Sequence, residues 1–255
     1  MPESESNRAL AYEVPPALRN IRIVLVEPQI PGNIGSVARA MKTVGLQDLA
    51  LVRPVPFRDS EEAYRFASGA HDLLESAREY DTLAEAAEDL HFLVGTTNRR
   101  RGGMLSQPIP MREAAQQIAA IAGRQRVGIL FGREDFGLSS IELARCNLGA
   151  AIPMAVGMPS LNLSHAVQVA AQEVFVACLE PQPAPPPESA PVGAVEALIS
   201  RFGELFQLLG SDALTHPAPQ ALDSLRCIFS RVGLQPRDVR TLHMVVRAMI
   251  RRLRQ

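Results

Sequence analysis

The sequence predicts an α/β protein built on a parallel sheet, followed by a small all-helical domain. Apolar runs rich in β-branched residues, such as IRIVLV (21–26) and RVGILF (126–131), are typical of strands that are covered on both faces. Helical stretches alternate with these runs, and strands joined through a helix pair in parallel. The alternation stops at PQPAPPPESAP (181–191), where six of eleven residues are proline, as in a semi-rigid linker.

The first strand–helix–strand unit follows a polar stretch, residues 1–19, that we expect to form a flexible arm. The run 21–26 is the first predicted strand. A helix is expected over 33–44, with Asn33 in the entry loop or at the cap. The second strand is expected over 49–54, and the helix between the two strands makes them parallel neighbours.

The same alternation continues through residue 179. The expected strands cover 91–96, 126–131 and 149–154, and the expected helices cover 61–68, 83–90, 111–123, 139–146 and 161–179. Ser139 and Glu142 have the spacing of a capping box at the start of one of these helices. The stretch 166–179 is almost continuously apolar, and a helix that is hydrophobic all round must be buried. We therefore expect residues 20–180 to form one α/β domain.

Three further helices, 192–209, 218–231 and 236–254, are expected beyond the linker. The region 192–255 carries nine arginines and five acidic residues, a net charge of +4. The whole chain carries −1, so any surface for nucleic acid must be a local patch such as this one. All but one of the 26 basic residues are arginine, which suits phosphate binding, although a GC-rich gene gives the same bias.

Composition disfavours a metalloprotein, a redox protein with a cysteine pair, a secreted protein and a membrane-spanning protein. Cys146, Cys178 and Cys227 lack the spacing of a metal site or a redox pair, so we expect buried, inert thiols and no metal. The first twenty residues contain no apolar signal core, and no apolar run approaches the length that spans a membrane. We expect a cytoplasmic protein with no membrane or DNA partner.

Three polar, glycine-containing segments stand where an apolar run passes into a helix. They are PGNIGSVARAMKTVGL (31–46), LFGREDFGLSSIEL (130–143) and MPSLNLSHAVQVAAQEV (158–174). Ligands of parallel α/β sheets bind at the carboxyl ends of the strands, so these segments predict one composite site. Each segment also has a purely structural interpretation, because Asn and Ser cap helices and an acidic residue suits a helix entry.

Together, in this order, the segments resemble the three signature motifs of the SPOUT-class (trefoil-knot) RNA 2′-O-methyltransferases. Within that class the sequence is most similar to the TrmJ group, which methylates tRNA in the anticodon loop. The matching positions are Asn33, Gly35, Ala38 and Arg39 in the first motif, Phe131, Gly132, Glu134, Gly137 and Leu138 in the second, and Ser160, Leu161, Asn162, Ser164 and Ala166 in the third. The stretch GTTNRRR (95–101) also resembles a loop of the TrmJ group.

The resemblance implies a sheet with a C-terminal trefoil knot, a homodimer and S-adenosylmethionine as cofactor. The implied cofactor-binding residues are Thr96, Thr97, Asn98, Gly132, Glu134, Ile152, Ser160, Leu161 and Asn162. The implied catalytic residues are Arg39, Asn33 and Ser160, and the implied RNA contacts are Arg39, Arg99 and Arg101. Because arginine does not give up its proton, we interpret Arg39 as a group that holds phosphate and orients the ribose, and its role as proton acceptor stays open.

The implied reaction is methyl transfer to a ribose 2′-OH of tRNA, at the cytidine or uridine of nucleotide 32. Three alternatives remain open. One is a 2′-O-methyltransferase for another tRNA or rRNA nucleotide, and another is a non-catalytic RNA-binding protein on the same fold. The third is a Rossmann-like small-molecule enzyme, against which the arginine loop and the basic C-terminal region argue. The segment EPQIPGN (27–33), where relatives carry other polar residues, bears on specificity and not on the reaction.

Overall fold

The computed structural model describes residues 12–98, 107–155, 160–181, 187–210 and 217–254. Its centre is a sheet of seven described strands in the order β3-β2-β1-β6-β4-β7-β5, with every neighbouring pair parallel. The strands are β1 (Ile21–Val26), β2 (Asp48–Val52), β3 (Arg78–Tyr80), β4 (Phe92–Thr96), β5 (Ile109–Pro110), β6 (Val127–Phe131) and β7 (Leu148–Ala151). The predicted parallel α/β class is confirmed, and the trefoil knot stays a prediction.

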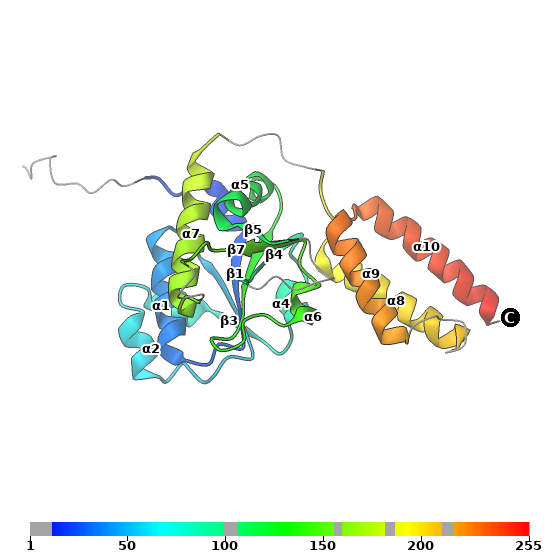
Figure 1. The fold of residues 1–255 in the computed structure, drawn as a ribbon, viewed down its shortest axis with the longest axis horizontal. Helices are drawn as coiled ribbons and strands as arrows, with labels where there is room; N and C mark the ends of the chain where they lie inside the picture. Colours follow the sequence, from blue (N-terminus) through cyan, green and yellow to red (C-terminus); the bar gives the residue numbers. More distant parts are fainter. Residues whose placement is uncertain (1–11, 99–106, 156–159, 182–186, 211–216, 255) are drawn as a thin grey trace, which may run out of the picture.

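Helices cover both faces of the sheet. Those of the sheet domain are α1 (Pro31–Thr43), α2 (Glu61–Phe66), α3 (His71–Ser76), α4 (Leu83–Ala87), α5 (Met111–Ala122), α6 (Ser140–Leu143) and α7 (Leu163–Leu179). Figure 1 shows α1, α5 and α7 on one side of the sheet and α4 and α6 on the other. The predicted capping box of Ser139 and Glu142 is present at the start of α6, and a second one joins Thr82 to Glu85 at α4.

The burial of β1 accounts for its almost entirely apolar sequence. All six of its residues are buried. Ile21, Ile23 and Leu25 face the core beneath α1, α5 and α7, whereas Val24 and Val26 face the core beneath α4 and α6. Successive side chains of a strand point to opposite faces, so a strand with helices on both sides is apolar at nearly every position.

Arg22 is the one charged residue of β1, and its side chain is buried, with 1% exposure. Its guanidinium donates to Asp48 at 3.0 Å, to Asp89 at 2.7 Å and to the Ala86 carbonyl at 2.7 Å. A buried charge is tolerated when it is paired and hydrogen-bonded in this way. The cluster lies at the amino-terminal edge of the sheet, opposite to the edge that the three motifs follow.

Four short elements differ from the sequence-based expectation. The last residues of the expected arm and the first residue of the expected domain form a 3₁₀ helix, η2 (Pro16–Asn20), in which Leu18 is buried. The helix α3 and the short strands β3 and β5 were not predicted, because elements of six residues or fewer at the edge of a sheet carry no clear periodicity.

The helix α1 begins at Pro31, two residues before the predicted start, since proline suits the first turn. Asn33 therefore lies within the helix and not at its cap.

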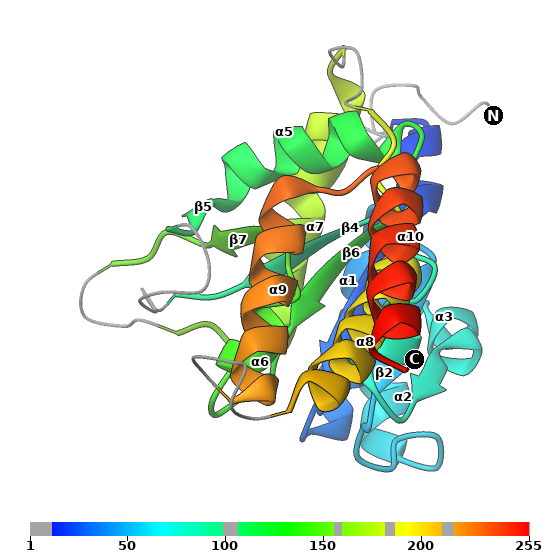
Figure 2. The same ribbon diagram turned by 90° about the vertical axis from the view of Figure 1, so that its right-hand side faces the viewer.

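The C-terminal region is helical, as expected. It consists of α8 (Val192–Leu209), α9 (Ala218–Val232) and α10 (Pro236–Leu253), which pack around Leu198, Val239 and Val246. Figure 2 shows these helices in front of the sheet, on the side of α6. None of the helices in the described part of the chain is long and apolar enough to cross a membrane. The domain boundaries drawn from the sequence stay a prediction, and part of the linker, 182–186, lies outside the described residues.

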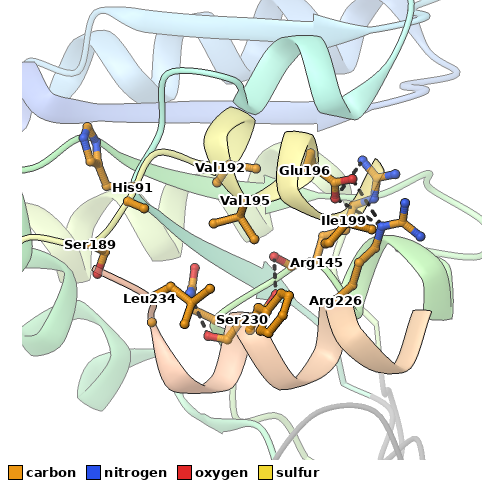
Figure 3. Close-up of a pocket in the computed structure, with 14 residues that line it drawn as sticks. His91, Arg145, Ser189, Val192, Val195, Glu196, Ile199, Arg226, Ser230 and Leu234 are labelled. Atoms are coloured by element: carbon orange, nitrogen blue, oxygen red, sulfur yellow. Dashed lines mark hydrogen bonds and ion pairs between the residues drawn. The ribbon is translucent and has the colours of Figure 1, made fainter. Parts of the chain in front are cut away.

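Specific contacts seat this helical region on the sheet domain. The backbone N–H of Val192 donates to the Leu90 carbonyl at 2.7 Å, and Asn147 Nδ2 donates to the Ser230 carbonyl at 2.8 Å. Figure 3 shows Glu196 between two arginines, with Arg226 at 3.2 Å and Arg145 at 3.9 Å. The hollow between these residues measures about 30 Å³, room for little more than a water molecule.

Candidate functional site

The three motifs meet at the carboxyl edge of the sheet, and Asn33 joins them. Its Nδ2 donates to Glu134 Oε1 at 2.8 Å, and its Oδ1 accepts from Asn162 Nδ2 at 3.0 Å. These partners are 101 and 129 residues away in the sequence. Asn33 is only 6% exposed, so both ends of its amide need partners, and each end has one.

The orientation of both amides follows from the helix cap at α7. Asn162 Oδ1 accepts from the backbone N–H of Ser164 at 2.8 Å, which makes Asn162 the N-cap of α7. Its Nδ2 is then the only end left for Asn33, so Asn33 must present its own Nδ2 to the Glu134 carboxylate. The capping function and the bridging function of Asn162 are therefore both present in one side chain.

A cleft of about 370 Å³ opens beside these contacts, within the range that is typical of small-molecule sites. It lies at the carboxyl ends of β4, β6 and β7. The residues implied to bind cofactor that line it are Thr96, Thr97, Asn98, Gly132, Glu134, Ile152, Ser160 and Leu161. Asn162 is not among the residues of its wall; it is exposed and is bonded to Asn33.

The loop between β6 and α6 forms one wall of the cleft, and it folds back on itself. Gly137 N donates to the Arg133 carbonyl at 2.8 Å, and the two residues form an isolated antiparallel bridge. A Cβ atom on Gly132 would lie 2.0 Å from the Gly137 carbonyl carbon, so no other residue fits there. Gly137 has φ of 68°, the left-handed region that glycine adopts without strain.

Arg133 holds this loop in place, although it is not among the residues that the sequence motifs predict to bind a ligand. It forms two bonds of 3.1 Å to the carboxylate of Glu142 and one of 2.6 Å to Glu27. Burial opposes the charge on Glu142, but the bonds from Arg133 and from the Ser139 backbone outweigh it and lower the pKa of that carboxyl. The loop is thus fixed both by the capping box at the start of α6 and by the ion pair between Arg133 and Glu142.

Glu27, the other partner of Arg133, was also missed. It follows β1 and has φ of 50°, which is uncommon for a residue with a side chain. Its carboxylate also pairs with Arg53, which follows β2 and has φ of 45°. Such backbone strain is often found beside functional sites. The available signal for Glu27 was position alone, since it directly follows the predicted strand 21–26.

The charge of the cleft is negative. Its charged lining residues in the described part of the chain are Arg133, Glu134 and Asp135, and Arg133 is already neutralised by Glu27 and Glu142. The two remaining carboxylates favour a ligand that carries positive charge near them. Backbone around Gly132 and Gly137 offers N–H and C=O groups to a flat polar ligand.

The residues expected to contact RNA lie elsewhere. Arg39 is exposed on α1 and is not among the residues that line the cleft of its own chain. Arg99 and Arg101 lie outside the described residues. Gly35 of the first motif has a packing function, because a Cβ there would lie 2.0 Å from the Ala63 carbonyl oxygen of α2.

The cysteines provide no nucleophile. All three are free thiols, and none of them lines the cleft. Burial raises the pKa of the Cys146 thiol to about 12 and that of the Cys178 thiol to about 11. Both thiols therefore stay protonated near neutral pH, so the site has no thiolate chemistry.

The comparisons with known proteins agree with this geometry. The model of the SpoU rRNA Methylase family matches residues 20–172. The tRNA (cytidine/uridine-2′-O-)-methyltransferase TrmJ of Cronobacter sakazakii is 41% identical over 88% of this chain and 94% of its own length. The protein of the same name from Salmonella typhimurium is 40% identical over 90% of this chain and 96% of its own.

A solved structure extends the likeness to the whole architecture. The crystal structure of TrmJ from Z. mobilis ZM4 superposes with a TM-score of 0.77 at 34% identity, over 89% of this chain and 98% of that one. The match therefore includes most of the C-terminal helical region. Because the family model matches residues 20–172 and a relative is 41% identical over 88% of this chain, the chain belongs to the SpoU rRNA methylase family.

Proposed function

We propose that this protein transfers a methyl group from S-adenosylmethionine to a ribose 2′-OH of tRNA, at the cytidine or uridine of nucleotide 32. The observation that carries the proposal is the bridge from Asn33 to Glu134 and Asn162, which joins the three motifs beside one cleft. Relatives named as tRNA (cytidine/uridine-2′-O-)-methyltransferases, about 40% identical over most of the chain, support the substrate.

The residues of the cleft suit the cofactor. S-adenosylmethionine supplies an electrophilic methyl group on a positively charged sulfonium. The negative charge of Glu134 and Asp135 matches that cation, and the glycine loop 132–137 matches a flat adenine. Thr96, Thr97 and Asn98 offer further polar groups at the end of β4. Asn33 fixes the loop through Glu134 and so keeps the cleft in shape without having to react.

The RNA is held by residues outside the cleft. We assign Arg39 to a phosphate of the target nucleotide, because its planar guanidinium binds phosphate and keeps its proton. Ser160 lies on the wall of the cleft and is assigned to the ribose side. Arg99 and Arg101 are assigned to further phosphates, which position the RNA without reading its sequence. Rate enhancement then comes mainly from alignment of the hydroxyl with the methyl group.

One experiment separates this function from its rivals. Unmodified tRNA is incubated with the full chain and S-adenosylmethionine, and ribose methylation is mapped nucleotide by nucleotide. Methylation at nucleotide 32 is expected, and tRNA with a 2′-deoxyribose there should accept nothing. Methylation of rRNA or of another tRNA nucleotide would support the alternative substrate. Failure to bind S-adenosylhomocysteine in calorimetry, with and without tRNA, would leave only the RNA-binding protein.

The active form is proposed to be a homodimer that pairs through α7. The described exposed residues of that helix form one stripe, and they are His165, Val169, Gln172, Val176 and Leu179. Their spacing of four and three residues is that of a helix seam, and Val169, Val176 and Leu179 are apolar and 37–42% exposed. Arg39 lies on the exposed side of α1, which packs against α7, and we assign Arg39 to the cleft of the partner.

The dimer is tested by light scattering of the full chain at micromolar concentration. A mass of twice 27.7 kDa is expected. Replacing Val176 with glutamate should give the single-chain mass, because a charge buried in the seam is unfavourable. Replacing the exposed Val232 of α9 with glutamate is the control and should leave the dimer intact. A wild-type protein that has the single-chain mass would contradict the proposal.

A further inference from the structure

Two loops meet at the rim of the cleft, and one of them is the segment 27–33 that departs from the family pattern. Gln29 N donates to Glu134 Oε2 at 2.9 Å, and Gln29 Nε2 donates to Asp135 Oδ2 at 3.2 Å. The first loop follows β1 and the second follows β6, and these strands are neighbours in the sheet. Gln29 is exposed, so the remaining groups of its amide face solvent.

Each loop also exposes a large apolar side chain. Phe136 is 67% exposed and lines the cleft, and Ile30 is 42% exposed beside Gln29. Phe136 stands at the end of the folded-back loop between Arg133 and Gly137. The ion pairs of Arg133 with Glu27 and Glu142 hold that loop, so Phe136 is presented from a fixed backbone. Exposing a phenylalanine costs free energy, and a ligand that covers the ring recovers it.

We propose that Phe136 is a stacking platform for the base of the target nucleotide, and that Gln29 binds the pairing edge of that base. This inference rests on the proposed function. A target base in a single-stranded loop is turned out of its stack, and proteins that read such bases stack them on aromatic rings. The position of Phe136 on the wall of the cleft places the stacked base next to the site where the methyl group is presented.

The amide of Gln29 suits both pyrimidines. One of its two N–H groups is held by Asp135, which leaves the second N–H as a donor and the carbonyl as an acceptor. Cytidine presents the N4–H donor beside the N3 acceptor, and uridine presents the N3–H donor beside the O2 acceptor, so the two bases offer the same order of groups displaced by one position along the pairing edge. Gln29 can therefore bind either base without changing its bond to Asp135, which agrees with a methyltransferase that accepts both.

The first test compares Phe136→Ala, Phe136→Trp and the matched control Ile141→Ala. Ile141 is 60% exposed on α6 but does not line the cleft. Phe136→Ala is expected to lower kcat/KM for tRNA about tenfold or more, since base stacking on an aromatic ring contributes about 1–3 kcal/mol. Phe136→Trp should stay close to wild type, and so should Ile141→Ala. The affinity for S-adenosylhomocysteine should change less than threefold in all three variants.

A second measurement reports the stacking directly. An anticodon stem-loop with a fluorescent cytidine analogue at nucleotide 32 should change its emission on binding to wild type and to Phe136→Trp, and not to Phe136→Ala. Equal kcat/KM for Phe136→Ala and wild type overturns the inference. So does an equal loss of cofactor affinity, which makes Phe136 a cofactor contact, or a changed mass in light scattering, which makes it a subunit contact. If wild type methylates no tRNA, the proposed function itself fails.

Discussion

Replacing Arg39 with alanine is expected to lower kcat for methyl transfer by about 100-fold or more, while the affinity for S-adenosylhomocysteine stays within about twofold. Loss of one preorganised charged group at a reacting centre has an effect of this size. The cofactor is expected to be unaffected, because Arg39 does not line the cleft of its own chain. Single-turnover kinetics and calorimetry measure the two quantities separately.

The neighbouring helix positions provide the controls. Lys42 lies three residues further along α1, is also exposed, and pairs with Asp72. Lys42→Ala should retain activity, which shows that removal of a positive charge from α1 is not by itself harmful. Arg39→Lys should be nearly as poor as Arg39→Ala, since lysine lacks the planar fork that binds phosphate. Activity of Arg39→Ala within a few-fold of wild type would make Arg39 an ordinary surface residue.

Mixed dimers determine on which cleft Arg39 acts. A chain with Arg39→Ala is combined with a chain in which Gly132→Val disrupts the wall of the cleft, because a Cβ at Gly132 would lie 2.0 Å from the Gly137 carbonyl carbon. If Arg39 serves the partner's cleft, the mixed dimer contains one intact cleft facing one intact arginine and recovers activity. If samples in which the two variants have exchanged subunits recover no activity, Arg39 acts at the cleft of its own chain.

The sequence predicted most of the sheet because its central strands are marked by their burial. A strand covered on both faces must be apolar throughout, and β1 and β6 are recognisable for that reason. The edge strand β3 consists of Arg78, Glu79 and Tyr80, none of them buried, so nothing in its composition distinguishes it from a loop. Its place is fixed by the backbone pairing to β2, which the sequence does not reveal.

Many of the residues that line the cleft were named from the sequence, but the bonds that connect them were not. The residues named from the sequence include twelve of the seventeen described residues that line the cleft, because motifs reflect local requirements for glycine, amides and hydroxyls. The bond between Asn33 and Asn162 spans 129 residues and depends on how α1 and α7 pack. Arg133 and Glu27 were missed for the same reason, since an ion pair between loops leaves no mark in either loop. Arg22 shows the same limit, because its buried charge is compensated by aspartates of other elements.

Removal of two arginines from α10 is expected to weaken tRNA binding and to make it less dependent on salt. Arg240, Arg247 and Arg251 are exposed at helical spacing on α10, with Met244 between them at 66% exposure. No ion pair joins these three arginines to any residue within the described ranges of the chain, whereas Arg254 pairs with Glu204 at 2.6 Å. Uncompensated arginines along one helix face are the arrangement that binds a phosphate backbone. These three exposed arginines on one face of α10 therefore carry much of the net charge of +4 beyond the linker.

The test compares two double variants that remove the same charge. Arg247→Ala with Arg251→Ala should reduce the slope of log affinity against log salt by about 2, one for each lost phosphate contact, and weaken binding alike for all tRNAs. Arg201→Ala with Arg254→Ala is the control, because both arginines are already paired with Glu204, and its slope should stay at the wild-type value. Point variants are preferable to truncation, since the helices are seated on the sheet domain through Val192 and Asn147. Equal slopes for the two double variants and wild type would show that α10 does not dock RNA, and the phosphate contacts would then have to come from the sheet domain alone.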